Sequence, residues 1–307
     1  MRCQYCSTAL PSGHSKCPSR KCGRWNLARP KESIDNGTVL LSDATLSIET
    51  RIKTGLVDEV FGGGLGIAQT SVNLLGGEPG AGKTTLCLML ADIFCAEFPD
   101  KEALYIANEQ APAELKATAT RLKLKHANRI RIVKAMGGVA HELGEIMLHY
   151  RPSVTFLDSV TMFAGEDSAL AVVVCQRLKA YSVELNAPAI VVNHLTKGGE
   201  HAGLNKLQHA VDMTCLFDLL LDPDEDPTPS TPRRLMSVKN RNGPAPVTQY
   251  FAMTETGLVS ITLETAMSLE SSQGSIHNTE TCGEDSEDSE DSEDNEDNED
   301  NEDNEDD

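Results

Sequence analysis

Residues 77–84 have the sequence Gly77-Glu78-Pro79-Gly80-Ala81-Gly82-Lys83-Thr84, which matches G-x-x-x-x-G-K-[ST] at every fixed position and is typical of a phosphate-binding loop. An apolar run, residues 72–75, precedes it, and residues 85–90, with apolar side chains at helical spacing, follow it. Backbone N–H groups of such a loop surround phosphates, and the positive end of the following helix is directed at them. We therefore predict that this loop and Thr85 bind a nucleotide, with Lys83 at the β- and γ-phosphates and the Thr84 hydroxyl on Mg²⁺.

Three further residues end apolar runs that have the length of strands. Asp158 follows residues 154–157 and is predicted to hold Mg²⁺; the alternative is a cap of the next helix. Glu109 follows residues 104–108, and His194 follows residues 189–193. The carboxyl ends of parallel strands face one crevice. We therefore expect Glu109 to act as the base for a water molecule and His194 to sense the γ-phosphate. The alternatives are an ordinary acid at a helix start and an ordinary polar loop residue.

The body of the chain alternates between strand-like and helix-like segments. This pattern predicts an α/β fold with a doubly wound, mostly parallel sheet, and the helix-free end predicts an antiparallel extension. The expected strands are 71–75, 103–107, 130–133, 154–157 and 189–193, the expected helices are 84–98, 113–124, 139–150 and 169–185, and the helix-free strands are 215–221, 234–239 and 247–253.

The formal net charge of −20 is unevenly distributed along the chain. Residues 284–307 hold 17 of the 47 acidic residues and no basic ones, in Ser-Glu-Asp and Asn-Glu-Asp repeats. The first 30 residues hold six basic residues and no acid. The overall charge therefore does not argue against nucleic-acid binding. We expect a cysteine-rich head (1–30), a linker (31–50), an ATPase-type body (51–263) and a disordered acidic tail (264–307).

Other features exclude two classes of protein. No apolar run is long enough to span a membrane, and no apolar segment follows the N-terminal charge as in a secretory signal. We therefore expect a cytoplasmic protein without a membrane partner. In such a compartment clustered cysteines indicate metal binding rather than disulfides.

The head carries the spacing Cys3-x2-Cys6-x10-Cys17-x4-Cys22. Two close pairs of thiolates can close a tetrahedral Zn²⁺ site, and a head too small for its own core would need one. His14 is an alternative ligand, and an incidental or redox thiol cluster is the alternative interpretation. Four of the remaining cysteines are expected to be buried core residues: Cys87, Cys95, Cys175 and Cys215. The last one, Cys282, lies at the start of the tail and has no evident partner in the sequence.

Several motifs, in their order along the chain, resemble the bacterial RadA (Sms) family of RecA-like ATPases. Five of them are Arg-Ile-Lys-Thr-Gly at 51–55, Gly-Gly-Gly-Leu at 62–65, the phosphate loop, His-Leu-Thr-Lys-Gly-Gly at 194–199 and Lys-Asn-Arg-Asn-Gly at 239–243. Two further stretches, residues 207–212 and residues 251–258, also resemble the family, and residues 17–26 resemble the end of its zinc ribbon. The resemblance covers about residues 1–260, and the Lys-Asn-Arg motif is its most diagnostic part.

The resemblance implies a RecA-like core and a function. RadA proteins are ring-forming, DNA-stimulated ATPases of recombinational repair that move on single-stranded DNA and promote branch migration. The implied cofactors are ATP, Mg²⁺ and Zn²⁺. The implied partners are single-stranded or branched DNA, copies of the same chain in a hexameric ring, and a replicative helicase or recombinase. Lys239 and Arg241 match the family's Lys-Asn-Arg residues and would supply cations near the γ-phosphate, in one chain or across a subunit interface. A solvated basic turn is the alternative.

The loop 196–206 follows His194 and holds Lys197 and Lys206. In RecA-like cores a loop here lines the ring channel, so we expect these lysines to bind single-stranded DNA and the loop to be disordered without it. An ordinary surface loop is the alternative. The basic head could also bind DNA, or be a structural knob.

Two departures from the family stand out. RadA proteins continue into a Lon-protease-like domain, whereas here a low-complexity segment follows Val259, so we expect no protease and a less stable ring. Asn242 replaces the usual Phe of the Lys-Asn-Arg motif. The alternative functions are a nucleotide-gated assembly switch of the RecA/KaiC kind and an inactive adaptor. The intact set Lys83, Thr84, Asp158 and Glu109 argues against the adaptor.

Overall fold

The computed structural model describes most of the body and part of the head. The described residues are 50–134, 142–165, 167–194, 202–220, 228 and 230–274, together with 3, 6, 8, 9, 17–19, 21 and 22. The predicted linker lies outside them apart from Thr50, and so does residue 275 onward.

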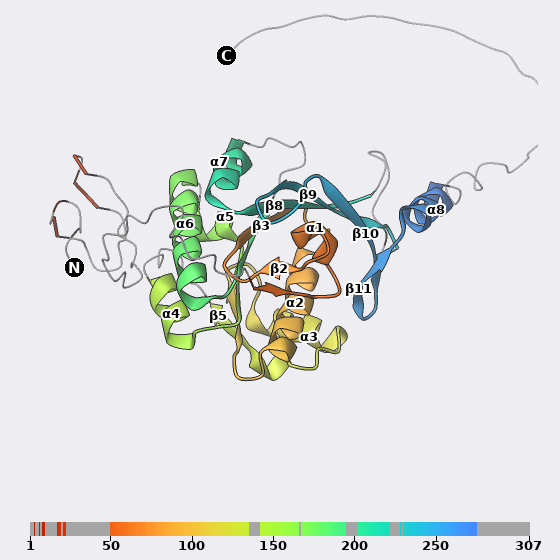
Figure 1. Cartoon of the computed structure of the whole chain (residues 1–307), viewed down its shortest axis with the longest axis horizontal. Coiled ribbons are helices and arrows are strands. Elements are labelled where there is room, and N and C mark those ends of the chain that lie inside the picture. The colour runs from red at the N-terminus through yellow and green to blue at the C-terminus, as the bar shows by residue number, and fades with distance from the viewer. Residues whose placement is uncertain are drawn as a thin grey trace, which may run out of the picture.

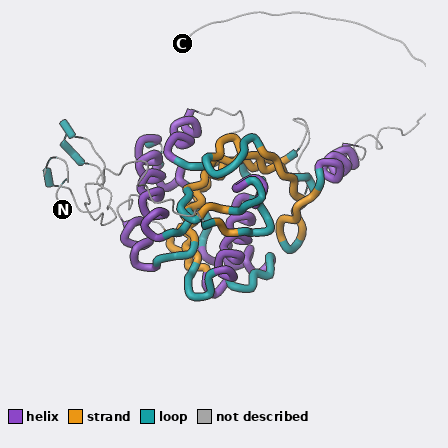
Figure 2. The backbone as a smooth tube through the Cα atoms, viewed as in Figure 1, coloured by secondary structure: helices purple, strands orange, loops and turns teal. Residues whose placement is uncertain are grey.

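A nine-stranded sheet with the order β11-β10-β9-β8-β3-β7-β6-β4-β5 forms the centre of the body (Figures 1 and 2). Six neighbouring strands run parallel, and the last three in sequence are antiparallel. The strands are β3 (Val72–Gly77), β4 (Ala103–Ala107), β5 (Ile130–Lys134), β6 (Val154–Asp158), β7 (Ala189–His194), β8 (Met213–Leu219), β9 (Arg233–Asn240), β10 (Val247–Thr254) and β11 (Gly257–Ile261). The doubly wound α/β fold with an antiparallel extension is therefore confirmed.

Helices cover both faces of this sheet, as Figure 1 shows. One face carries α1 (Asp58–Gly62), α2 (Lys83–Glu97) and α3 (Pro112–Arg121), and the other carries α4 (Glu142–Tyr150), α5 (Val160–Ala164), α6 (Ser168–Leu185) and α7 (Ala202–Ala210). A two-stranded ribbon of β1 (Arg51–Ile52) and β2 (Ile67–Ala68) flanks α1. The helix α8 (Leu263–Gly274) follows β11.

Alternation along the parallel strands divides the core in two. Leu75 and Phe156 pack in the cluster that contains α2, while their chain neighbours Leu74 and Leu157 pack in the cluster that contains α4 to α7. Side chains of a strand point alternately to opposite faces. Because both faces are covered, every residue of β3, β4 and β6 is buried, as is typical of parallel sheets.

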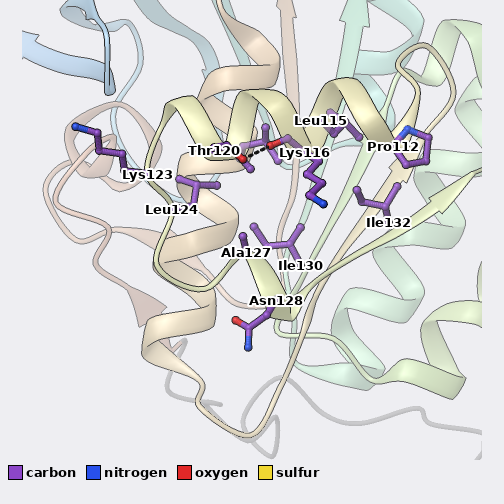
Figure 3. A pocket seen from close by; sticks show the side chains of 12 residues that line it. Pro112, Leu115, Lys116, Thr120, Lys123, Leu124, Ala127, Asn128, Ile130 and Ile132 are labelled. Carbon is purple, nitrogen blue, oxygen red and sulfur yellow. Dashed lines mark hydrogen bonds between the residues drawn. The ribbon is translucent and has the colours of Figure 1, made fainter.

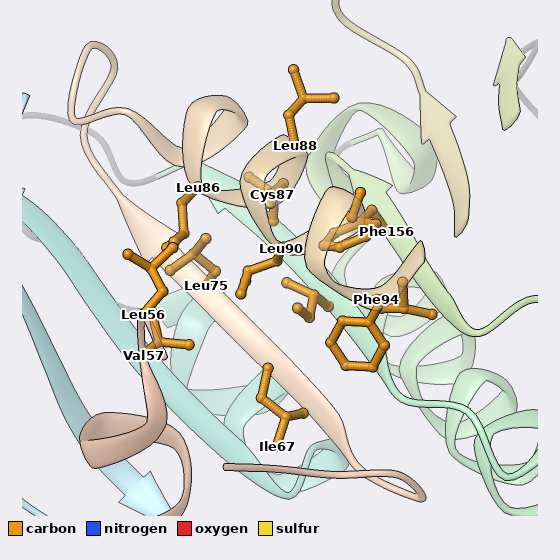
Figure 4. Packing of buried hydrophobic residues seen from close by; sticks show 14 of the residues in the cluster. Leu56, Val57, Ile67, Leu75, Leu86, Cys87, Leu88, Leu90, Phe94 and Phe156 are labelled. Atoms are coloured by element: carbon orange, nitrogen blue, oxygen red, sulfur yellow. The ribbon is translucent and has the colours of Figure 1, made fainter. Parts of the chain in front are cut away.

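The helix after the phosphate loop is anchored by residues four positions apart. Figure 4 shows Leu86, Leu90 and Phe94 of α2 against the sheet, with Leu75 and Phe156 in the same cluster. All five side chains are at most 1% exposed. This packing fixes the first turn of α2 over the end of β3, which is where a bound phosphate would have to be held.

Most sequence-predicted elements occur, but two predicted unstructured segments contain helices. The predicted loop 196–206 overlaps α7, because Leu207 and Val211 are buried against the sheet and outweigh the local glycines. The predicted disordered tail from residue 264 begins inside α8, where Ala266 is fully buried. The short elements α1, α5, β1, β2 and β11 were not predicted. No helix among the described residues is long and apolar enough to cross a membrane.

Replacing Phe94 by Ala tests the role of α2 packing. We expect Phe94→Ala to lower the free energy of unfolding by about 3–5 kcal/mol, because it removes a fully buried ring. Val183→Ala is the control, since this side chain is 56% exposed and its loss should cost less than about 0.5 kcal/mol. Urea unfolding followed by circular dichroism measures both; equal losses would contradict the assigned core.

Candidate nucleotide site and cysteine cluster

The phosphate loop connects β3 directly to α2, in a conformation that requires glycine at its two ends. Gly77 has a φ of +157°, and a Cβ placed there would lie 2.1 Å from the carbonyl oxygen of Phe217 on β8. Gly82 precedes α2 with a φ of +102°, and a Cβ there would lie 2.8 Å from the Cε of Met253. The glycines therefore allow close packing beneath the loop and leave its N–H groups free of side chains.

Lys83, the first residue of α2, folds its side chain back over this loop. Its ammonium group donates hydrogen bonds to the carbonyl oxygens of Gly77 (2.8 Å) and Glu78 (2.7 Å), and the residue is only 5% exposed. Burial lowers the pKa of Lys83, and the charges of Asp158 and Glu109 partly oppose that shift. The cation is thus positioned at the loop, where the oxygens of a phosphate could replace the carbonyls as acceptors.

Asp158 ends β6 beside the first turn of α2. One of its oxygens, Oδ2, accepts hydrogen bonds from the Thr84 hydroxyl (3.2 Å) and from the Tyr105 hydroxyl (2.6 Å). Burial raises the pKa of Asp158, while these two donors lower it. A carboxylate and a hydroxyl side by side are the oxygen ligands that Mg²⁺ accepts, so Thr84 and Asp158 fit the predicted metal site.

Glu109 and His194 meet in front of Asp158. The Glu109 Oε2 atom lies 2.8 Å from His194 Nε2, and the Ser159 hydroxyl donates to Glu109 Oε1. Ligand atoms of Glu109, Asp158 and His194 all lie within 4.8 Å of one another. The structure therefore brings together the carboxyl ends of β4, β6 and β7 at one point.

Two residues of this site were missed by the sequence analysis. Tyr105 lies in the middle of β4 and resembles a core aromatic, and only its hydroxyl contact reveals its link to Asp158. Ser159 is a helix N-cap, whose hydroxyl also accepts from the Met162 backbone. The only available signal for Ser159 was its position directly after Asp158.

Lys239 and Arg241 lie near the amino-terminal ends of β3 and β8, away from the strand ends that carry the phosphate loop, Glu109 and His194. Lys239 donates to the carbonyl oxygens of Val211 (2.6 Å) and Gln208, at the end of α7. Arg241 Nη1 is 3.7 Å from Asp212, whose carboxylate accepts the backbone N–H of Val72 at the start of β3. The phosphate loop follows the other end of β3, so the structure does not bring these two cations to the nucleotide site of their own chain.

The predicted DNA-binding lysines are only partly described. Lys197 lies outside the described residues. Lys206 is exposed on α7, with its ammonium group 3.4 Å from the Ser168 hydroxyl. The role of both residues stays a prediction.

The four head cysteines converge on one point. The Sγ atoms of Cys3 and Cys22 are 3.8 Å apart, those of Cys6 and Cys17 are 3.5 Å apart, and none of the four forms a disulfide. All four sulfur atoms lie within 4.8 Å of one another. Ligands about 2.3 Å from a tetrahedral zinc ion lie about 3.8 Å from each other, so this arrangement fits Zn²⁺.

Zinc binding at the cysteine cluster is testable by X-ray absorption. We expect the full chain to bind about one zinc ion with four sulfur ligands at about 2.3 Å. Cys17→Ser should lose the metal, because it removes one of the four thiolates. Cys175→Ala, at a core position far along the sequence, should retain it. Nitrogen or oxygen ligands in the spectrum, or full zinc content in Cys17→Ser, would disprove the four-thiolate site.

Comparison with known proteins places this geometry in a family. A family model described as "ATPase: KaiC" matches residues 48–265. The DNA repair protein RadA of Treponema pallidum is 29% identical over 283 residues, which cover 84% of this chain and 58% of that protein. RadA of Bacillus subtilis is 29% identical over 292 residues, with the same two shares. RadA of Haemophilus influenzae is 31% identical over 227 residues, covering 71% of this chain and 46% of that protein.

The chain thus spans less than two thirds of the length of these relatives. The family match includes β3, the phosphate loop and the strand ends that carry Glu109, Asp158 and His194. The chain therefore belongs to the KaiC-type ATPase family and is a relative of the bacterial DNA repair protein RadA.

Proposed function

We propose that this protein hydrolyses ATP with Mg²⁺, is stimulated by single-stranded DNA, and acts in DNA repair by remodelling or branch migration. The observation that carries the ATPase part is the convergence of Lys83, Thr84, Asp158 and Glu109 at the end of β3. The name of the relatives, DNA repair protein, supports the DNA part.

The residues of the site divide the work of hydrolysis. Lys83 and the loop N–H groups would hold the phosphates, and Thr84 and Asp158 would hold Mg²⁺. The metal ion supplies positive charge that offsets the charge developing on the transferred phosphoryl group. The Glu109 carboxylate would orient a water molecule and accept its proton. Ser159 and His194 fix the direction of this carboxylate, because each contacts one of its oxygens.

His194 would link the nucleotide to DNA. It ends β7, contacts Glu109 and directly precedes the predicted DNA-binding segment with Lys197. A change in the Glu109–His194 contact would therefore be passed to that segment. Lys239 and Arg241 would act on the nucleotide of a neighbouring copy, which requires a homo-oligomer. To reach that nucleotide, Lys239 would have to leave its carbonyl acceptor at the end of α7, and Arg241 would have to leave Asp212.

Steady-state turnover tests this proposal. We expect ATP hydrolysis to rise when single-stranded DNA is added, and DNA binding to weaken as salt increases. Lys83→Ala should lose nucleotide-dependent activity. Glu109→Gln should bind ATP but turn it over about 10²–10⁴-fold more slowly, since it removes the general base. Glu97→Gln, which neutralises an exposed acid at the end of α2, is the matched control and should behave as wild type.

Two outcomes would contradict the proposal. Undiminished turnover in Glu109→Gln would show that another group is the base. Turnover unaffected by DNA, together with assembly that depends on ATP, would favour the nucleotide-gated switch instead, which the KaiC description of the family model also fits.

Tyr105→Phe tests how the metal-side carboxylate is held. Loss of the 2.6 Å hydrogen bond removes a donor that lowers the pKa of Asp158. We expect the Mg²⁺ concentration needed for half-maximal turnover to rise about tenfold. Because the pKa of Asp158 rises further, loss of activity on acidification should begin at a higher pH. Tyr181→Phe, a buried tyrosine in the other core cluster, is the control; the same shift there would contradict a specific role for Tyr105.

A further inference from the structure

A large cavity lies between α3, β5 and α2, among residues that the nucleotide site does not use. Its volume is about 680 Å³, which is within the range of about 300–1,000 Å³ that is typical of binding pockets. Figure 3 shows its walls: α3 and the chain after it on one side, and the start of β5 on the other. Most of the lining side chains are apolar, and they include Leu88, Leu115, Leu124, Ala127, Ile130 and Ile132.

The cavity adjoins an edge of the main sheet. β5 is the last strand in the sheet order, and within the described ranges it pairs only with β4. Ile130 and Ile132 of β5 line the cavity, while Arg131 between them does not. An extended peptide can add to such an edge through main-chain hydrogen bonds, with every second side chain entering a pocket on one face. The strand edge and the cavity therefore suit the same kind of occupant.

The charge around the cavity has one sign. Lys116 and Lys123 are the only charged residues that line it, and both are exposed. In the part of the chain that the structure describes, neither ammonium group lies within 4.0 Å of a carboxylate. In Figure 3, Lys116 extends from α3 toward the side of the cavity where Ile130 lies.

The neighbouring acids already have other partners. Glu114 accepts the backbone N–H of Ala111 (2.9 Å), Glu102 pairs with Arg131, and Asp92 accepts the backbone N–H of His126. These acids therefore do not pair with the two lysines at the rim, on a protein whose formal net charge is −20. A positive rim around an apolar floor complements a ligand with acidic residues next to apolar ones.

We propose that this cavity and the edge of β5 dock an extended segment of a partner protein, apolar at alternate positions and flanked by acidic residues. Its apolar side chains would fill the space beside Leu124 and Ile132, and its acids would lie near Lys116 and Lys123. The site is separate from the ATPase proposal, because among the described residues none of those that line the cavity makes a hydrogen bond or ion pair with Lys83, Asp158 or Glu109.

The test uses the full chain and a fluorescein-labelled peptide, Asp-Glu-Val-Thr-Ile-Asn-Val-Asp-Glu, followed by fluorescence anisotropy. We expect saturable binding that weakens as salt is added, since the rim charges are exposed and screened. Lys116→Glu should weaken binding about tenfold or more, because it places like charges together. Lys53→Glu is the matched control: it makes the same charge change at an exposed lysine outside the cavity, and binding should stay at the wild-type level.

A second variant tests the apolar floor without changing charge. Ala127→Phe places a ring at an exposed lining position and should block the peptide, while thermal unfolding checks that the fold is retained. The proposal is overturned if the wild-type chain does not bind the peptide, or if Lys53→Glu and Lys116→Glu weaken it equally. If the peptide does not bind and Ala127→Phe changes the oligomeric state measured by light scattering, the cavity is instead an interface between copies of this chain. Turnover of ATP plays no part in these measurements, so the two proposals fail independently.

Discussion

The buried carboxylate of Asp158 constrains the arrangement of three elements. A charge that is removed from water is costly unless donors surround it. Here the donors come from α2, through Thr84, and from β4, through Tyr105. β4 and β6 are neighbours in the sheet, whereas α2 is connected to β3, two strands beyond β6. The hydrogen bonds to one oxygen atom therefore fix the first turn of α2 over the strand ends that carry Glu109 and His194.

The two ends of β3 perform different tasks. Its carboxyl end continues into the phosphate loop, while its first residue, Val72, donates to the Asp212 carboxylate. Asp212 also accepts from Lys179 of α6 (2.7 Å) and lies near Arg241. One strand thus connects the nucleotide site to the opposite strand ends, where the Lys-Asn-Arg motif lies.

The order and type of the central helices and strands could be predicted because each element has a recognisable local pattern of residues. Strands such as β4 and β6 are mostly apolar runs. The spacing of the glycines and Lys83 in the phosphate loop is specific for phosphate binding between a strand and a helix. Asp158, Glu109 and His194 could be selected as candidates because each directly follows a run of strand length. Their contact with one another could not be predicted in this way, because it depends on the strand order of β7, β6 and β4, which no local pattern encodes.

The misjudged segments have a common physical cause. In α7 the glycine favours a loop, yet Leu207 is buried in the core and stabilises a helix. In α8 polar residues surround Ala266, whose burial is visible only in three dimensions. Tertiary contacts outweigh local preference in both segments. Tyr105 shows the same limit at the site, since a tyrosine in a strand does not disclose which group its hydroxyl will meet.

The antiparallel extension has a practical meaning for anyone who shortens this chain. Phe217 of β8 lies directly against Gly77, and its ring meets that of Phe251 on β10 edge to face, with centroids 6.1 Å apart. Met253, also on β10, borders Gly82. These strands are the side wall of the phosphate loop, and β11 covers β10 in turn. An expression boundary placed after β8, the last parallel strand, would remove the part of this wall that β10 supplies, so a shortened fragment has to extend through Ile261.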